Sequence, residues 1–295
     1  MSWVLLTLLA VNFWAFANII DKYVIGNHIK NPFIYVGIGS LPTLLYTIIL
    51  VLVFGVTIPS LFYFLIALVP GVLTTIAFLM YAKAIDAEEV SRVIPLYGLG
   101  TIFTLLLSTI FLQEIFTLGK YLGIILLVVG SFFISYKYHK SSGRFSKAFL
   151  FMAIVSALYA VSWVIVRYLS YSMDSMSIFI ISEIGLVVSA FIPFIANIDQ
   201  IRKIFIKDNK IIYFRLLSGF LGFLGLLVYY KAISEGSAAL TTALDLTQAF
   251  FVLVYATLIS IFIPKILKEE IKGSIITLKI LAIALMIIGS YLISV

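Results

Sequence analysis

Long apolar runs, separated by short stretches that contain charged residues, proline or glycine, dominate the chain. The runs approach the ~20 residues that a helix needs to cross a bilayer, whereas a barrel strand would alternate apolar and polar residues over ~10 positions. The pattern therefore predicts an all-α integral membrane protein with ten transmembrane helices. The expected helices cover residues 3–21, 33–54, 60–82, 93–112, 121–137, 148–168, 177–196, 213–231, 239–262 and 277–294.

The hydrophobic pattern of the first half returns in the second half. Leu68–Ile85 shares eight of its 18 residues with Leu216–Ile233, and Lys120–Ser135 shares eight of its 16 residues with Lys279–Ser294. Such similarity between two groups of apolar segments is typical of transporters that are built from structural repeats. The sequence therefore predicts two copies of one five-helix unit.

The repeat also predicts the domain organisation. Asn12–Tyr23 aligns with Ala157–Tyr168, so we expect the first apolar segment to be a helix of the repeat and not a cleaved leader. Because each unit holds an odd number of helices, the second unit enters the membrane from the opposite side, which makes the repeat inverted. We expect one unit in residues 1–138 and the other in residues 148–295, joined by a loop at 139–147.

The composition agrees with a membrane protein. The chain is 63% hydrophobic and 11% charged, with a mean hydropathy of +1.20. This leaves too little polar surface to cover a water-soluble globule of 295 residues. The chain has no cysteine, and His28 and His139 both fall in expected loops. We therefore expect no thiolate or histidine metal site and no cofactor.

The loop charges predict an orientation. Seventeen of the 20 Lys and Arg residues follow the first, third, fifth, seventh and ninth helices, and the opposite face has only Lys120, Arg167 and Lys231. The positive-inside rule places the richer face in the cytoplasm and both termini outside. Topology and attraction to anionic lipid then explain the formal net charge of +7, so no nucleic-acid partner is expected.

A short motif links the chain to a known family. Residues 81–85 read Tyr-x-Lys-Ala-Ile at the end of the third expected helix, Glu114 follows Ala84 by 30 residues, and the fifth helix ends near Gly130-Ser131. This pattern resembles the EamA-type half-repeat of the drug/metabolite transporter superfamily. The resemblance implies ten helices, a central cavity between the two halves, and transport of small organic solutes such as amino acids, amines, sugars or drugs.

The chain departs from this family in three respects. The slot for the family's fourth-helix proline falls near Thr101, whereas this chain has its proline at Pro95. Glu269 and Glu270, which stand where the first half has its acidic residue, follow an insertion. Many relatives also have cytoplasmic termini, opposite to the orientation that the loop charges predict.

Two carboxylates fall inside expected helices. Glu183 lies about six residues into the seventh helix and Asp245 about six residues into the ninth, and both helices start from the same face. At 1.5 Å per residue, both lie roughly 9 Å deep. A charge there costs about 2.5–3.5 kcal/mol on insertion scales, so each carboxylate needs a partner, a proton or water. We expect a shared cavity in which they bind a cation or carry protons; local pairing with Gln248 or Arg167 is the alternative.

Aromatic residues fall on the helices that line the cavity in related transporters. Together with a carboxylate they could surround an organic cation, because an aromatic face attracts an ammonium group by about 0.5–2 kcal/mol. Packing and anchoring at the bilayer interface is the alternative role. Of Asn12 and Asn18 on the first helix, one is expected to line the cavity. The candidate binding or proton-coupling residues are Glu183, Asp245, Asn12, Trp14, Tyr81, Tyr97, Tyr159, Trp163, Tyr229 and Gln248.

These observations predict a secondary-active transporter of the cell membrane that moves a small organic solute, cationic or amine-bearing, by alternating access. A proton-coupled exporter of neutral amino acids or metabolites is the alternative. An intramembrane enzyme would need a nucleophile with its base, or a metal cluster, inside the helices, and the sequence contains neither pattern. The expected partners are the solute, membrane lipid and protons, and both a monomer and a homodimer remain open.

Overall fold

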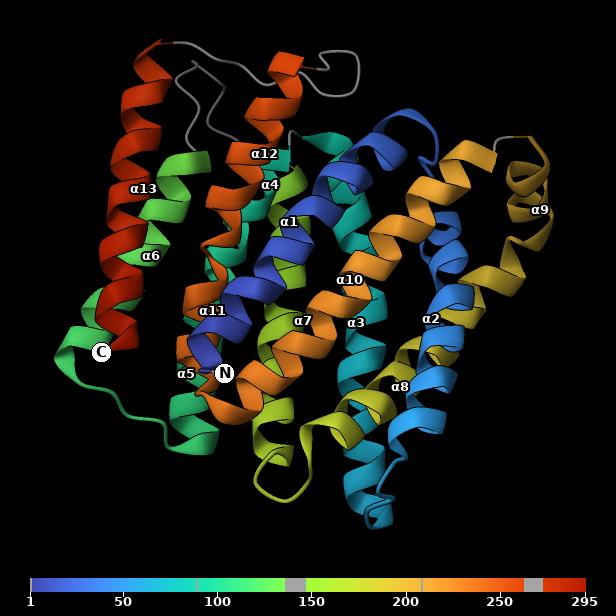
Figure 1. Cartoon of the computed structure of the whole chain (residues 1–295), viewed down its shortest axis with the longest axis horizontal. Coiled ribbons are helices and arrows are strands. Elements are labelled where there is room, and N and C mark those ends of the chain that lie inside the picture. The colour runs from blue at the N-terminus through green and yellow to red at the C-terminus, as the bar shows by residue number, and fades with distance from the viewer. Residues whose placement is uncertain (1, 89, 136–146, 208, 263–272) are drawn as a thin grey trace.

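The computed structural model describes residues 2–88, 90–135, 147–207, 209–262 and 273–295. Within these residues the chain forms helices and connecting turns, without any strand. Figure 1 shows one bundle of helices with both chain ends in its lower half. The prediction of an all-α protein is confirmed. Nearly all of the expected linker at 139–147 lies outside the described residues, as do Glu269 and Glu270.

The two halves contain corresponding series of helices. The first half consists of α1 (Trp3–Asn27), α2 (Pro32–Phe54), α3 (Leu61–Ala87), α4 (Val90–Val93), the 3-10 helix η1 (Ile94–Tyr97), α5 (Gly98–Leu112) and α6 (Leu118–Ser135). The second half consists of α7 (Lys147–Leu169), α8 (Ser175–Ala196), α9 (Ile198–Lys207), α10 (Asn209–Glu235), α11 (Ala238–Asp245), α12 (Gln248–Phe262) and α13 (Gly273–Ser294).

Eight helical segments within the described residues are long and apolar enough to cross a membrane. Two shorter apolar stretches, Leu118–Phe133 in α6 and Ile280–Ser294 in α13, lie where the fifth and tenth spans were expected. The protein is therefore a multi-pass membrane protein. The fourth span runs through η1 into α5, and the ninth combines α11 and α12.

Polar residues define where several helices begin. The side chains of Asn31, Asp174 and Ser237 each accept a hydrogen bond from a backbone N–H in the first turn of α2, α8 and α11, respectively. Pro32 occupies the first turn of α2, where its missing N–H costs nothing. These caps satisfy donors that have no partner inside the helix.

Several helices run further than the hydrophobic pattern predicts. α1 continues to Asn27 and α3 to Ala87, so Lys22 and Lys83, which were counted as loop charges, lie within helices. Arg215 was also counted as a loop charge, although it falls inside the expected span 213–231, and it lies within α10. The prediction ended the first helix at a charged residue and the third directly before one. A helix can continue past such a residue where a cavity or neighbouring polar groups receive the charge.

The short helix α9 is a further difference from the prediction. Its apolar residues Ile198, Ile201 and Ile204 recur at helical spacing among polar residues, so it contains no continuous apolar run. Ile201 is buried, whereas Arg202 and Lys203 are exposed. α9 thus lies against the end of the bundle as an amphipathic connection between α8 and α10.

Helix packing repeats when the two halves are exchanged. α1 packs along α10, while α3, which corresponds to α10, packs along α7, which corresponds to α1. α2 packs against α8 and α6 against α13, and both of these pairs join corresponding helices of the two halves. This is the two-fold arrangement that an inverted repeat predicts.

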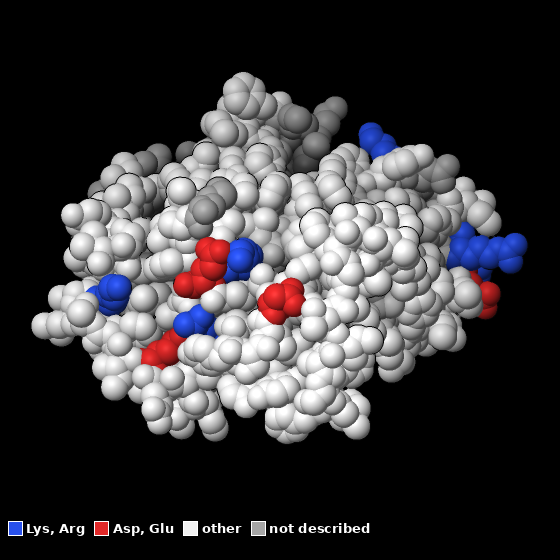
Figure 2. All heavy atoms as spheres, turned by 60° about the horizontal axis from the view of Figure 1, so that its bottom comes forward, with Lys and Arg blue, Asp and Glu red and all other residues white. Residues whose placement is uncertain are grey.

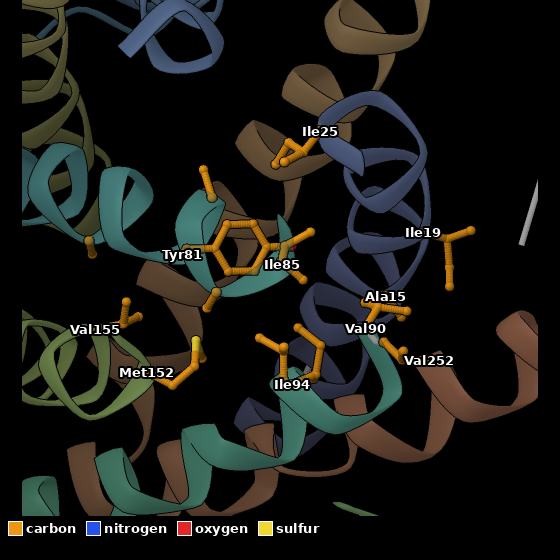
Figure 3. Packing of buried hydrophobic residues seen from close by; sticks show 14 of the residues in the cluster. Ala15, Ile19, Ile25, Tyr81, Ile85, Val90, Ile94, Met152, Val155 and Val252 are labelled. Atoms are coloured by element: carbon orange, nitrogen blue, oxygen red, sulfur yellow. The ribbon is translucent and has the colours of Figure 1, made fainter. Parts of the chain in front are cut away.

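A buried apolar cluster holds the bundle together beside α1, α3 and α7. Ile85 of α3, Ile94 of η1 and Met152 of α7 are at most 2% exposed in this cluster, which Figure 3 shows from close by. Because lipid is as apolar as these side chains, their stabilising effect in a membrane comes mainly from close van der Waals packing.

Glycine lets α3 and α8 approach each other closely. A Cβ atom at Gly71 would collide with the carbonyl oxygen of Ser182, and a Cβ atom at Gly185 would collide with the backbone of α3. The repeat aligns Gly71 with Gly219 of α10, where a Cβ atom would meet only Nη1 of Arg215, at 3.0 Å. Equivalent positions are therefore tightly packed in the first half and open in the second.

The lower end of the bundle carries few charged groups (Figure 2). We call the end at which α1 finishes and α2 begins the upper face, and the end that carries both termini the lower face, as they stand in Figure 1. Figure 2 brings the lower side forward and shows a mostly uncharged surface with a few acidic and basic groups. This appearance agrees with the small number of basic residues expected there.

Candidate functional site

A central cavity lies between the two halves. Its volume is about 130 Å³. A cavity of about 150 Å³ can bind benzene, so this space suits a small organic molecule. Helices α1, α2, α3 and α5 of the first half and α7, α8, α10, α11 and α12 of the second contribute to the wall.

The cavity extends towards the upper face. Tyr35 and Arg215 line it, and both lie within the first two turns of helices that begin at that face. From the lower face, α1 first reaches the wall at Trp14, about three turns after its start at Trp3. The cavity is thus closed towards the lower face.

Helix α8 carries Glu183 into the cavity wall. The side chain lines the cavity, and the residue is 3% exposed. Glu183 makes no hydrogen bond or ion pair with any residue that the structure describes. A charged carboxylate at this depth is unfavourable unless a proton, water or a cation accompanies it.

Asp245 lies where the ninth span is broken. Leu246 and Thr247 separate α11 from α12, and the N–H of Thr247 donates to the carbonyl of Leu244 at 3.1 Å. Asp245 lines the cavity, with the Tyr229 hydroxyl 3.4 Å from its Oδ2 atom. Irregular backbone is tolerated at membrane depth where it lines a cavity.

The fourth span breaks at the corresponding place, at η1 between α4 and α5. The spans expected over 93–112 and 239–262 are therefore present, but each contains an irregular turn that was not predicted. Both breaks fall inside apolar runs, and the hydrophobic pattern does not distinguish a broken run from a continuous helix.

Aromatic rings from three helices form one wall of the cavity. Trp163 stacks on Tyr159 with ring centroids 5.5 Å apart and planes 3° from parallel. Tyr229 lies between Trp163 and Trp14, with its ring centroid 4.9 Å from each. Tyr229 is fully buried, so it supports the wall from behind while Trp14, Tyr159 and Trp163 line the cavity.

Eight of the ten candidate residues line the cavity, and two do not. The eight are Trp14, Tyr81, Tyr97, Tyr159, Trp163, Glu183, Asp245 and Gln248. Tyr229 lies behind the wall. Asn12 accepts a hydrogen bond from the hydroxyl of Tyr255 at 2.6 Å, and the asparagine of α1 at the cavity is Asn18. Binding or proton transfer by any of these residues stays a prediction.

Local pairing with Arg167 does not account for the two carboxylates. The Nε atom of Arg167 lies 3.5 Å from Oε1 of Glu114, without the geometry of a hydrogen bond. Its Nη1 atom donates to the carbonyl oxygen of Ser234 at 2.9 Å. Across the described residues, no group of three or more His, Cys, Asp or Glu side chains could hold a metal ion.

Two charged residues of the cavity were not predicted from the sequence. Asp21 and Arg215 both line the cavity and are each 7% exposed. Nε of Arg215 donates to the carbonyl oxygen of Tyr35 at 3.1 Å, and the guanidinium lies over the Tyr35 ring, 4.1 Å from its centroid. The sequence does contain a pattern that points to Asp21. Trp14, Asn18 and Asp21 occupy positions i, i+4 and i+7, which share one face of a helix.

The geometry agrees with a comparison to known families. Residues 1–136 match the EamA-like transporter family. The predicted resemblance to the drug/metabolite transporter superfamily is confirmed over these residues. Members of the family are transporters and not enzymes, in agreement with the expected function.

Two further similarities extend the comparison. A 69-residue segment is 35% identical to an uncharacterized protein of Methanocaldococcus jannaschii and covers 23% of this chain and 50% of that protein. The match therefore spans only half the length of that relative. A crystal structure of another protein superposes with a TM-score of 0.69 over 98% of this chain and 95% of the other, at 13% identity. This likeness shows a shared fold alone.

Proposed function

We propose that this protein is an alternating-access carrier of a small amine-bearing organic solute, with Glu183 and Asp245 as the binding or proton-carrying groups. One observation carries the proposal: both carboxylates line one cavity, and neither forms an ion pair with a described Lys or Arg. A solute ammonium group would provide the missing positive charge. Each ring of the aromatic wall would add about 0.5–2 kcal/mol of attraction.

Unequal packing of corresponding helices supports alternating access. α3 contacts α8 closely at Gly71, whereas Gly219 and Gly222 of α10 line the cavity without a close helix opposite them. An inverted repeat allows these two interfaces to exchange roles. In the second state α10 would close on α2, α3 would part from α8, and the cavity would open towards the lower face.

Proton-coupled export of a neutral solute is the second candidate. Hydroxyl groups of Thr75, Thr101, Thr104 and Ser156 occur in the cavity wall and suit a neutral polar molecule. In this case Glu183 and Asp245 would only bind and release protons.

We further propose that the upper face is cytoplasmic and that the protein resides in the cell membrane. The support is the excess of Lys and Arg in the loops that the sequence assigns to that face. With this orientation the cavity opens towards the cytoplasm.

The test is a thermal-shift screen of the purified protein with amines and their neutral analogues, followed by flux measurements in liposomes at several pH values. Glu183→Gln or Asp245→Asn should abolish flux, or remove its pH dependence, while expression and Tm stay close to wild type. Asp199→Asn, an equivalent neutralisation on exposed α9, is the matched control. Normal flux with an unchanged pH profile in both cavity variants would overturn the proposal.

A further inference from the structure

A second polar group lies on α1, nearer to the upper face than Glu183. Asn18 and Asp21 are about one turn apart on the same side of the helix, and both line the cavity. Each is 7% exposed. Nδ2 of Asn18 and Oδ1 of Asp21 are buried and have no hydrogen-bond partner among the residues described.

Tyr81 sets the orientation of the Asn18 amide. Its hydroxyl donates to Oδ1 of Asn18 at 2.7 Å, so the amide acceptor is occupied while the Nδ2 donor has no partner. The Asp21 carboxylate also interacts with the side chains of Tyr35, Ser218 and Tyr81, but its Oδ1 atom has no partner. An unpaired buried donor and an unpaired buried acceptor are each unfavourable, because such atoms have lost water without a replacement. The two atoms are complementary to one group that accepts a hydrogen bond from Asn18 and donates another to Asp21.

Arg215 determines which charge that group can have. Its positive charge interacts electrostatically with Asp21, while the contacts with Tyr35 hold the guanidinium at the cavity wall. Asp21 therefore differs from Glu183 and Asp245, since it already has a cation nearby. A second cation at this place would be repelled by Arg215, and a neutral group fits better.

We propose that Asn18 and Asp21 form a second subsite, which binds a neutral hydroxyl or carboxamide group of the transported amine. The inference rests on the proposed function, in which Glu183 and Asp245 hold the amine end. Trp14 lies on the same face of α1, one turn before Asn18, and would contact the apolar part of the solute between its two polar ends.

The experiment measures the affinity of the purified wild-type protein for matched five-carbon ligands by isothermal titration calorimetry. 5-Aminopentanol or 5-aminopentanamide should bind at least about tenfold more tightly than pentylamine, since a site built for a polar group discriminates against an analogue without it. The better of the two identifies the hydroxyl or the carboxamide. Cadaverine, whose far end is a second cation, should gain nothing over pentylamine.

Variants of residues on α1 test whether Asn18 causes the preference for the hydroxyl or carboxamide ligand. Asn18→Ala should reduce the tenfold preference to about one while the affinity for pentylamine stays unchanged. Asn12→Ala is the matched control, because Asn12 is hydrogen-bonded to Tyr255 away from the cavity and the preference should remain. If Asn18→Ala does not fold, Asn18→Leu takes its place, because leucine has the same number of side-chain heavy atoms but no amide. The preference of the wild-type protein for the polar analogues is also required.

The possible results separate this inference from the proposed function. Equal affinities for pentylamine and its hydroxyl and carboxamide analogues would overturn the subsite and leave the amine site standing. Tight binding of pentanol or pentanamide, equal to that of the amino compounds, would support the subsite and overturn the amine site. Absence of binding by the whole set would overturn both.

Discussion

Lys22 and Arg167 cap corresponding helices from opposite faces of the bundle. Nζ of Lys22 donates to the carbonyl oxygen of Ile85 at 2.6 Å, near the upper end of α3. Nη1 of Arg167 lies 3.4 Å from the carbonyl oxygen of Ile233, near the lower end of α10, and donates to it. The repeat aligns Lys22 with Arg167 and Ile85 with Ile233. One interaction therefore occurs twice, related by the two-fold symmetry of the fold.

Arg167→Leu should destabilise the protein by about 1–3 kcal/mol, because the largely buried Glu114 would lose its cation and the last carbonyls of α10 would lose a donor. Lys231→Gln is the control, because its ion pair with Glu235 is exposed and contributes less than about 1 kcal/mol. Denaturant unfolding in detergent measures both. A loss in the Arg167 variant no greater than in the control would show that the contact is not structural.

Gly71→Ala should lower Tm and expression, because the new methyl group would collide with the carbonyl oxygen of Ser182 in α8. Gly219→Ala should lower Tm less, since the new methyl group would meet only the end of the Arg215 side chain, at 3.0 Å, and no backbone, but it should reduce flux if α10 must close on α2. Thermal unfolding and liposome flux of the two variants test this pair. Normal flux in Gly219→Ala would argue against a close approach of α10 and α2 during transport.

Asp174 should stabilise the start of α8 in a pH-dependent way. Partial burial opposes ionisation, but hydrogen bonds from Ser177 and neighbouring amides outweigh it and lower the pKa of Asp174 below its usual value of 3.8. A lowered pKa stabilises the folded state at pH values above 3.8, and this contribution is lost as the pH falls through the lower value.

Asp174→Ala should therefore cost about 0.5–2 kcal/mol at neutral pH and progressively less in acid below the usual pKa. Asp174→Asn keeps an acceptor for the cap, so it should lose less and show no such pH dependence. Unfolding curves at neutral and acidic pH compare the three proteins. A constant difference between wild type and Asp174→Ala across this range would contradict the role of the charge.

Thiol labelling should report the orientation directly, because the chain has no cysteine of its own. Ser172→Cys, in the exposed turn after α7 at the lower face, should react with an impermeant maleimide in intact cells. Gln200→Cys, on exposed α9 at the upper end, should react only after permeabilisation. The reverse pattern would place both termini in the cytoplasm, as in many relatives.

The two acidic candidates and the two missed charges show what sequence reasoning could find. Glu183 and Asp245 stand out because each interrupts a long apolar run, where a charge is costly and therefore conspicuous. Asp21 and Arg215 lie near the ends of such runs. A charged residue at such a position is equally typical of a loop. Only the course of α1 and α10 through the bundle brings both side chains to the cavity.

The sequence by itself determined the membrane class, the approximate helices and the repeat, because these depend on local hydropathy and on similarity between segments. Only the tertiary structure decided that Asn18 and not Asn12 faces the cavity, since the two residues point in different directions around α1. It also decided that Gly71 is packed while its equivalent Gly219 is open. That difference arises from contacts between the two halves, and no single segment contains them.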